Sequence, residues 1–332
     1  MLASGLTMVF VFSAMAQYGG GGGNGGGSIG GGNAGGGGSG AGGNTGGAAS
    51  VYNFNGNYHL GFDKPEAWGL KYFASTTLLS GLQPPDPEGW KVGSLNVGFE
   101  LGWLPTLDTG QRRIGFQGTV PEDLNKTQVF FRPVLRVGLP KKLTLMLAAP
   151  PPFEAFGVRP HLLAFGVERP ILEREHWTLG WRGYGQVGSV KGAFTCPHSV
   201  LAFAAGSPQN PTECVGESAD AASLRYAGSE IQFAYRVSRM PKLVPHVAVG
   251  GNFIDGVFHV HAPVEDGMDR TRLWTRGGTF STTAGVSYLI TKKAAFTVDL
   301  FYSPLWVQRS TTAPTTNDGL FNVRAFLSYS FR

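Results

Sequence analysis

The sequence predicts an all-β fold, a closed antiparallel transmembrane β-barrel of about twelve strands, from three observations. Apolar and polar residues alternate with a period of two in many short segments between Val51 and Arg332. Long and short connections between these segments alternate from residue 105 onward. No run in the chain reaches the roughly 18 to 20 apolar residues that a membrane-spanning helix needs.

The first 50 residues are predicted to lie outside the barrel. Residues 1–16 are typical of a signal peptide, because the apolar run LTMVFVF precedes Ala14 and Ala16 in the spacing that signal peptidase cleaves. Residues 17–50 are glycine with scattered Asn, Ser and Ala, which lack the side chains needed to offset the entropy of ordering. We expect this segment to be a disordered periplasmic tether and residues 51–332 to form the barrel.

The period of two identifies the individual strands. In the last one, Phe321, Val323 and Leu327 share one parity while Asn322 and Arg324 share the other, and successive side chains of a strand point to opposite faces. The strands are predicted at about 51–62, 68–81, 90–104, 127–139, 143–151, 158–169, 176–191, 227–239, 244–260, 278–290, 294–308 and 320–332.

The lengths of the connections favour a barrel. Residues 105–126 and 192–226 are long connections, whereas 140–142, 241–243 and 291–293 are tight turns. An even number of strands with short turns at one end and long loops at the other is the pattern of membrane barrels, whose closed sheet pairs every backbone polar group within the protein. The alternative is a secreted soluble β-sandwich, in which the apolar faces of two sheets pack together.

Over residues 51–332, the sequence resembles the single-chain, porin-like outer-membrane β-barrel proteins of Gram-negative bacteria. The most specific feature is the last strand, in which Tyr329 and Phe331 resemble the C-terminal insertion signal of that family. The resemblance implies a bacterial outer-membrane location, with outer-membrane lipid, lipopolysaccharide and the barrel assembly machinery as partners. It identifies no subfamily and leaves the oligomeric state open.

If the apolar parity faces lipid, the polar parity faces the lumen. Six of its charged side chains are cationic and three are anionic, and the set comprises Lys71, Glu100, Arg132, Arg136, Arg182, Glu230, Arg236, Asp299 and Arg324. A water-filled lumen with excess positive charge favours anionic solutes. Alternatively, these side chains pair with one another and fill the barrel.

These interpretations give two functions from different classes. The first is a channel for small solutes, anionic ones in particular. The second is a closed barrel that acts as a surface anchor, a receptor or a structural outer-membrane protein. An enzyme is not expected, because no nucleophile, base and orienting group can be assigned to one site.

Cys196 and Cys214 lie in one predicted loop and are expected to form a disulfide in an oxidising compartment. No metal site is expected, because His259 and His261 stand two residues apart without a third ligand. No cofactor is expected either. The net charge of +5 comes from dispersed Lys and Arg residues, so nucleic acid is not an expected partner.

Overall fold

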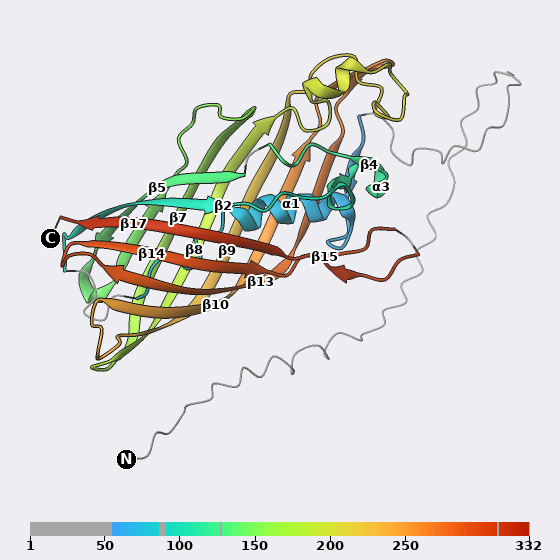
Figure 1. Ribbon diagram of the computed structural model, residues 1–332. Helices are drawn as coiled ribbons and strands as arrows, with labels where there is room; N and C mark the ends of the chain where they lie inside the picture. Colours follow the sequence, from blue (N-terminus) through green and yellow to red (C-terminus); the bar gives the residue numbers. More distant parts are fainter. Residues whose placement is uncertain (1–54, 86–90, 127, 311, 332) are drawn as a thin grey trace, which may run out of the picture. The chain divides into compact units, whose positions relative to one another are not determined.

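A computed structural model describes residues 55–85, 91–126, 128–310 and 312–331. The predicted signal peptide (1–16) and tether (17–50) lie outside these residues. In the part of the chain that the structure describes, the main sheet contains eleven strands, ten of which form a closed antiparallel barrel (Figure 1). The barrel strands are β2 (Leu95–Trp103), β5 (Val129–Gly138), β6 (Thr144–Ala148), β7 (Val158–Glu173), β8 (Trp177–Gly192), β9 (Asp220–Tyr235), β10 (Leu243–His259), β13 (Arg272–Leu289), β14 (Ala294–Ser303) and β17 (Leu320–Ser330).

Each barrel strand pairs with the barrel strands before and after it in the chain, and β17 pairs with β2 to close the ring. At the closing seam, Val323 lies opposite Trp103 and Ser330 opposite Asn96. This up-and-down order leaves no open edge along the ring, which is what a sheet in lipid requires. The predicted barrel is therefore confirmed, and the soluble β-sandwich is wrong because one sheet closes on itself.

The prediction of about twelve strands is wrong by two, both at the N-terminal end of the barrel domain. Among the described residues of the first predicted strand, 55–62, only Asn57–His59 form a strand; it is β1, which pairs in parallel with the start of β13. The second predicted strand, 68–81, is instead the helix α1 (Pro65–Thr76) followed by an extended segment.

The helix α1 escaped sequence analysis because it shows no apolar stripe. Every residue of α1 except Phe73 is buried, and a helix that is enclosed on all sides has no polar face to reveal its period. It begins at Pro65, whose missing N–H costs nothing at the first helical position. The chain then leaves the helix through the C-cap residue Thr77.

Short turns and long loops lie at opposite ends of the barrel. The long-loop end carries α2 (Thr109–Arg112), β3 (Arg113–Ile114), α3 (Gly115–Gly118), β4 (Val120–Pro121), the 3-10 helix η2 (His198–Ala202), β11 (Ala262–Val264), β12 (Gly267–Asp269), β15 (Trp306–Val307) and β16 (Thr316–Asn317). The 3-10 helix η1 (Pro140–Lys142) forms the turn between β5 and β6 at the other end, where β17 also ends (Figure 1).

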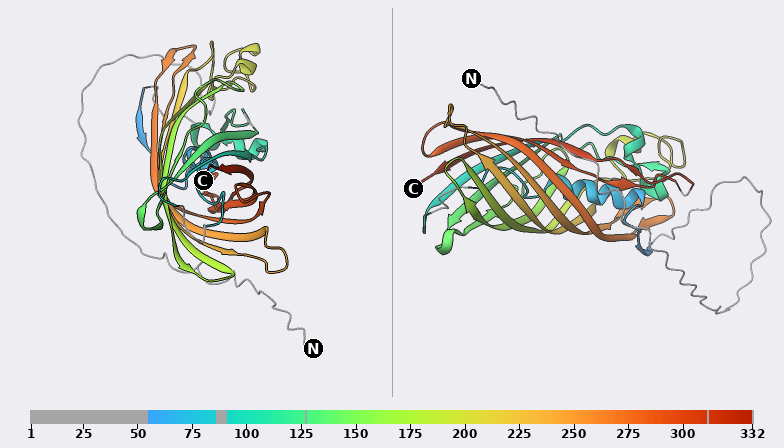
Figure 2. Two further views of the ribbon diagram at one scale, coloured as in Figure 1. Left: turned by 90° about the vertical axis from the view of Figure 1, so that its left-hand side faces the viewer. Right: turned by 90° about the horizontal axis from the view of Figure 1, so that it is seen from below.

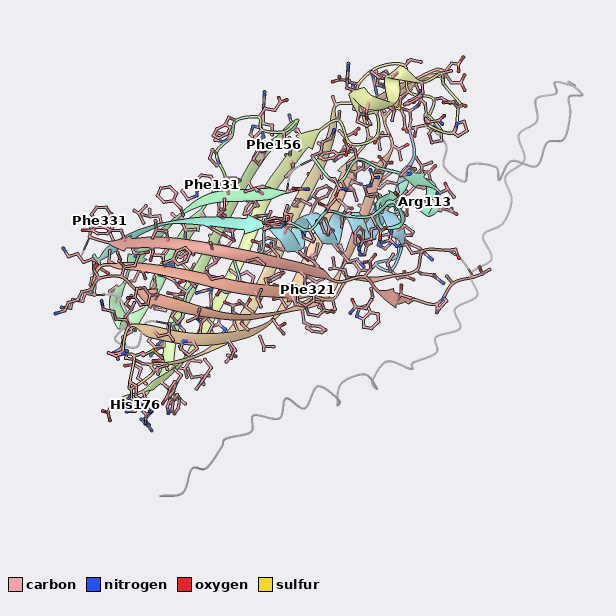
Figure 3. The ribbon with its side chains drawn as sticks, in the orientation of Figure 1. Arg113, Phe131, Phe156, His176, Phe321 and Phe331 are labelled. Carbon is pink, nitrogen blue, oxygen red and sulfur yellow. A yellow bond between two sulfur atoms is a disulfide. The ribbon has the colours of Figure 1, made fainter. Side chains whose placement is uncertain are left out.

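The outer face of the barrel is apolar. In β2 the exposed residues include Phe99, Leu101 and Trp103, while Asn96 and Glu100 on the other parity are buried. Phe131, Phe321 and Phe331 likewise project away from the barrel wall (Figure 3). Apolar side chains cover this exterior on strand after strand, which is the surface that a barrel presents to lipid acyl chains.

Candidate functional site

The candidate site is the barrel lumen, which the N-terminal segment of the described chain occupies. The helix α1 packs against β9, β10, β13 and β17, and it lies toward the long-loop end (Figure 2). The extended residues 77–85 continue from the helix toward the short-turn end. Leu78, Leu79 and Leu82 in this extended part are each 0 % exposed. Together with the helix and the residues before it, they form a segment, residues 60–85, that fills the space an open channel would need. We call residues 60–85 the plug.

The barrel wall makes room for the plug by carrying glycine where the two backbones approach. A Cβ atom added to Gly277 would lie 2.4 Å from the ring of Phe62, and one added to Gly180 would lie 2.6 Å from Pro85. Both distances are too short for any larger residue without movement. Gly81 in the plug has a φ of +71°, a conformation that glycine adopts without strain.

Three arginines of the wall donate hydrogen bonds to backbone carbonyls of the plug. Arg132 donates to Thr77 O at 2.7 Å and to Leu78 O at 3.2 Å. Arg324 donates from Nη1 to Leu78 O at 2.9 Å and to Ser80 O at 3.1 Å. Arg182 donates to the carbonyl oxygen of Gly81.

Carboxylates and a phenol of the wall bind the N–H groups of the same segment. Gly81 N donates to Glu230 Oε1 at 3.2 Å, and Leu82 N donates to Asp299 Oδ2 at 2.6 Å. Tyr226 accepts from Leu79 N and donates to Thr77 O. The extended plug has no neighbouring strand to bond its backbone N–H and C=O groups. Side chains of the wall bond these groups instead, which removes the free-energy cost of burying them.

The same charged side chains pair with one another. Arg182 lies between Glu168 and Glu230, with N–O distances of 2.7 and 2.9 Å. Arg132 Nε lies 2.5 Å from Glu100 Oε2, and His246 Nε2 lies 2.9 Å from Asp299 Oδ1. The arginines and carboxylates of this cluster are buried and bonded to one another or to His246, as the cost of desolvation demands.

Seven of the nine charged residues predicted from parity lie buried on the inner face of barrel strands. They are Glu100, Arg132, Arg136, Arg182, Glu230, Asp299 and Arg324. The assignment of Lys71 to a strand is wrong, because it lies on α1, where Nζ donates to Phe62 O and Trp306 O, both at 2.5 Å. The placement of Arg236 in the lumen is wrong as well, because β9 ends at Tyr235 and Arg236 is exposed in the following turn.

Glu168 and His246 are also buried inside the barrel, although the period of two did not predict them. Glu168 could not be recognised from the period of two, because the residues around it in β7 are apolar on both faces. On the inner face they are Leu162, Ala164 and Gly166. With Glu168 added and Lys71 and Arg236 removed, four arginines face four carboxylates along the middle of the wall. These described strand residues are therefore balanced in charge, whereas Lys71 belongs to the plug and not to the wall.

Two further predictions concern features outside the lumen. The disulfide between Cys196 and Cys214 is present, with the Cα atoms 5.7 Å apart, in the loop between β8 and β9. Tyr329 and Phe331 lie at the end of β17 with exposed side chains, and their ring centroids are 5.2 Å apart. Their role as an insertion signal stays a prediction.

The described residues contain no group of three or more His, Cys, Asp and Glu side chains that could hold a metal ion. Within the same residues, no helix has both the length and the apolar character needed to cross a membrane.

No known protein-family model matches the chain, and no curated protein matches its sequence. Solved structures that are similar include the outer-membrane protease OmpT from Escherichia coli, at 10% identity and a TM-score of 0.34, covering 72% of this chain and 94% of that one. The outer membrane protein OprG from Pseudomonas aeruginosa matches at 9% identity and a TM-score of 0.29, covering 74% and 100%. Neisserial surface protein A matches at 7% identity and a TM-score of 0.28, covering 71% and 95%.

The pairing of the strands, with β17 closing onto β2, confirms the barrel fold that the sequence predicted, and the subfamily is unresolved. The chain forms a closed antiparallel β-barrel with an apolar exterior and a charged, polar interior.

Proposed function

We propose that the protein is a bacterial outer-membrane barrel that its own N-terminal segment keeps closed, and that it serves as a membrane anchor rather than as an open channel. The observation that carries this proposal is the plug, whose residues Leu78, Leu79 and Leu82 are fully buried inside the wall. The apolar exterior supports the membrane location, because such a surface is stable only against lipid.

The solute channel expected from the sequence is less well supported. It would require residues 60–85 to leave the lumen, and their departure would break the bonds from Arg132, Arg182 and Arg324 to the plug carbonyls. The buried ions would then have to be rehydrated inside the barrel. The balance of four arginines against four carboxylates on the barrel strands also means that the wall itself does not favour anions.

Conductance measurements test whether the barrel is closed. Purified protein that migrates as a folded, heat-modifiable species is inserted into a planar lipid bilayer, and we expect no stable conductance steps. The matched variant Leu79→Asp/Leu82→Asp places two charges among buried plug residues, and it is expected to produce steps if it folds. Stable steps of uniform size from the wild-type protein would contradict the closed barrel and restore the channel.

The direction of the plug indicates what the anchor carries. Leu60 N donates to Trp274 O at 2.8 Å, and β1 pairs with Arg272–Trp274 at the long-loop end of β13. The far end of the plug reaches Pro85, beside Gly180 near the short-turn end of β8. The chain therefore enters the barrel at the long-loop end and leaves it at the short-turn end, where β2 begins.

This direction favours the cell-surface side for the residues that precede the barrel. Long loops of outer-membrane barrels face outward and short turns face the periplasm. A glycine-rich segment cannot cross lipid, because its backbone polar groups would have no partners, and the plug already fills the lumen. We therefore propose that residues 17–50 extend from the outer surface, in place of the periplasmic location expected from the sequence, and that displaying them is a role of the anchor.

Cysteine labelling on intact cells tests the sidedness. The native cysteines are joined in a disulfide, so a single introduced cysteine is the one free thiol. Ser28→Cys probes the glycine-rich segment, Glu265→Cys is the control in a long loop, and Lys141→Cys is the control in a short turn. A membrane-impermeant maleimide is expected to label positions 28 and 265 in intact cells, and position 141 only after the outer membrane is permeabilised.

Labelling of position 28 only after permeabilisation, together with position 141, would refute the surface location. That outcome would leave the closed barrel intact, since conductance tests it separately. No enzymatic activity is part of the proposal, and the absence of one stays a prediction.

A further inference from the structure

A cavity of about 70 Å³ lies at the long-loop end of the barrel, between α1, the loop that precedes β5 and the end of β10. Its apolar wall is built from Leu70, Phe73, Ile114, Phe194 and Phe258. Phe73 and Phe258 are only half-buried, so the cavity borders the solvent on their side. The cavity is separate from the ion pairs that hold the plug.

One wall of the cavity is acidic, formed by Glu66, Glu122 and Asp269. Two of these side chains bind backbone N–H groups: Glu66 Oε1 accepts from Gln117 N at 2.6 Å, and Asp269 Oδ1 accepts from Thr271 N at 2.8 Å. Glu122 differs from them. Its residue is 9 % exposed, and its Oε2 atom is buried without a hydrogen-bond partner among the described residues.

Nothing on the cavity wall neutralises this carboxyl group, since the described lining residues include no Lys or Arg. Burial raises the pKa of Glu122, and the neighbouring carboxylates Asp220, Glu66, Asp123 and Asp269 raise it further. An unpartnered buried acceptor in an otherwise apolar wall costs free energy that a donor from outside can recover. A cationic donor recovers the most, because it also offsets the repulsion among the carboxylates.

We propose that this cavity is a binding site for a small aliphatic amine, with its ammonium group on Glu122 Oε2 and its alkyl chain against Leu70, Phe73 and Phe258. The volume sets the size of the ligand. A cavity needs roughly 10 to 15 Å³ to hold one water-sized group, so about 70 Å³ has room for a short chain of about five such groups. A primary amine with four carbons fills this space.

Binding of n-butylamine to the full-length protein in detergent tests the proposal, measured by isothermal titration calorimetry with micelle blanks. Two compounds of the same size are the controls: 1-butanol, which is neutral, and butyrate, which is anionic. We expect n-butylamine to bind at least about tenfold more tightly than 1-butanol, and butyrate not to bind. Equal binding of amine and alcohol, or stronger binding of butyrate, would overturn the assignment.

Substitutions locate the site. Glu122→Gln keeps the shape of the side chain and removes its charge, and it is expected to weaken n-butylamine binding by about tenfold while leaving 1-butanol unchanged. Glu265→Gln makes the same chemical change in an exposed loop of the same barrel end and is expected to leave binding unaltered. Wild-type affinity in a folded Glu122→Gln protein would refute the role of Glu122. If that variant does not fold, Asp269→Asn serves instead, with loss of amine binding again expected and unchanged binding again refuting the acidic wall.

Discussion

Replacing Arg182 by methionine removes the guanidinium group that makes the most hydrogen bonds among the buried charged side chains of the wall. Arg182 is 0 % exposed and lies between Glu168 and Glu230, with N–O distances of 2.7 and 2.9 Å. It also donates to the carbonyl oxygen of Gly81 in the plug. The substitution removes the cation that two buried carboxylates share, and it removes the donor to one plug carbonyl.

The structure sets the expected magnitude. Removing one partner of a buried ion pair costs about 3 to 5 kcal/mol, and the lost bond from a charged donor adds about 1.5 to 3 kcal/mol. We therefore expect Arg182→Met to lower the free energy of unfolding by about 5 kcal/mol or more. Arg182→Lys keeps the charge but loses the planar fork that reaches both carboxylates and Gly81, so its cost is expected to be about half as large.

Equilibrium unfolding in guanidinium chloride, with the protein in lipid vesicles and tryptophan fluorescence as the signal, measures these differences. The triple variant Arg182→Met/Glu168→Gln/Glu230→Gln removes all three charges and is expected to recover most of the stability that the single substitution loses. A triple variant no more stable than Arg182→Met would refute the reasoning, because the cost would then arise from packing and not from uncompensated charge.

Three further perturbations test other parts of the structure. Cys196→Ser removes the disulfide to Cys214, which joins residues 18 positions apart. The free energy of unfolding of the loop should fall by on the order of 3 kcal/mol, and limited proteolysis should cut the loop faster while leaving the barrel strands intact. Gly98→Ala places a Cβ 2.2 Å from the ring of Phe326, so a cost of about 1 to 3 kcal/mol is expected from denaturant midpoints, and Phe326→Leu in the same chain should reduce it. Glu122 has a raised pKa in the folded state, so its neutral form stabilises the fold below the unfolded value near 4.5, and this contribution is lost as pH rises toward the folded pKa. Glu122→Gln should therefore flatten the decline of stability with rising pH, and an unchanged pH profile would contradict the burial of this carboxyl group.

The wall of the barrel could be predicted because the side of the wall that each residue faces depends only on its position along the strand. Neighbouring side chains of a strand point to lipid and to the lumen in turn, so Phe99 and Glu100 report the two environments within two residues. The same period placed Arg132 and Arg324 on the inner face without knowledge of what they bind. Where the period fails, as around Glu168 in a strand whose inner face is small and apolar, the charged residue went unnoticed.

The error at Arg236 has a different cause, since it arose from the ends of a strand and not from its period. The strand β9 spans Asp220–Tyr235, so it starts and ends earlier than predicted, and Arg236 falls into the turn. Strand ends depend on how far each neighbouring strand extends, which is a property of the whole sheet.

By itself, the amino-acid sequence determined that this chain is a barrel with an oily outside and a charged inside, because alternation along each strand depends only on adjacent residues. The tertiary structure alone decided that the inside is filled. The plug has no stripe of its own, and its carbonyls are bound by side chains far away in the chain, as Leu78 is by Arg324, 246 residues later. Bonds between such distant residues form only after the ring has closed, so no local pattern in the sequence predicts them.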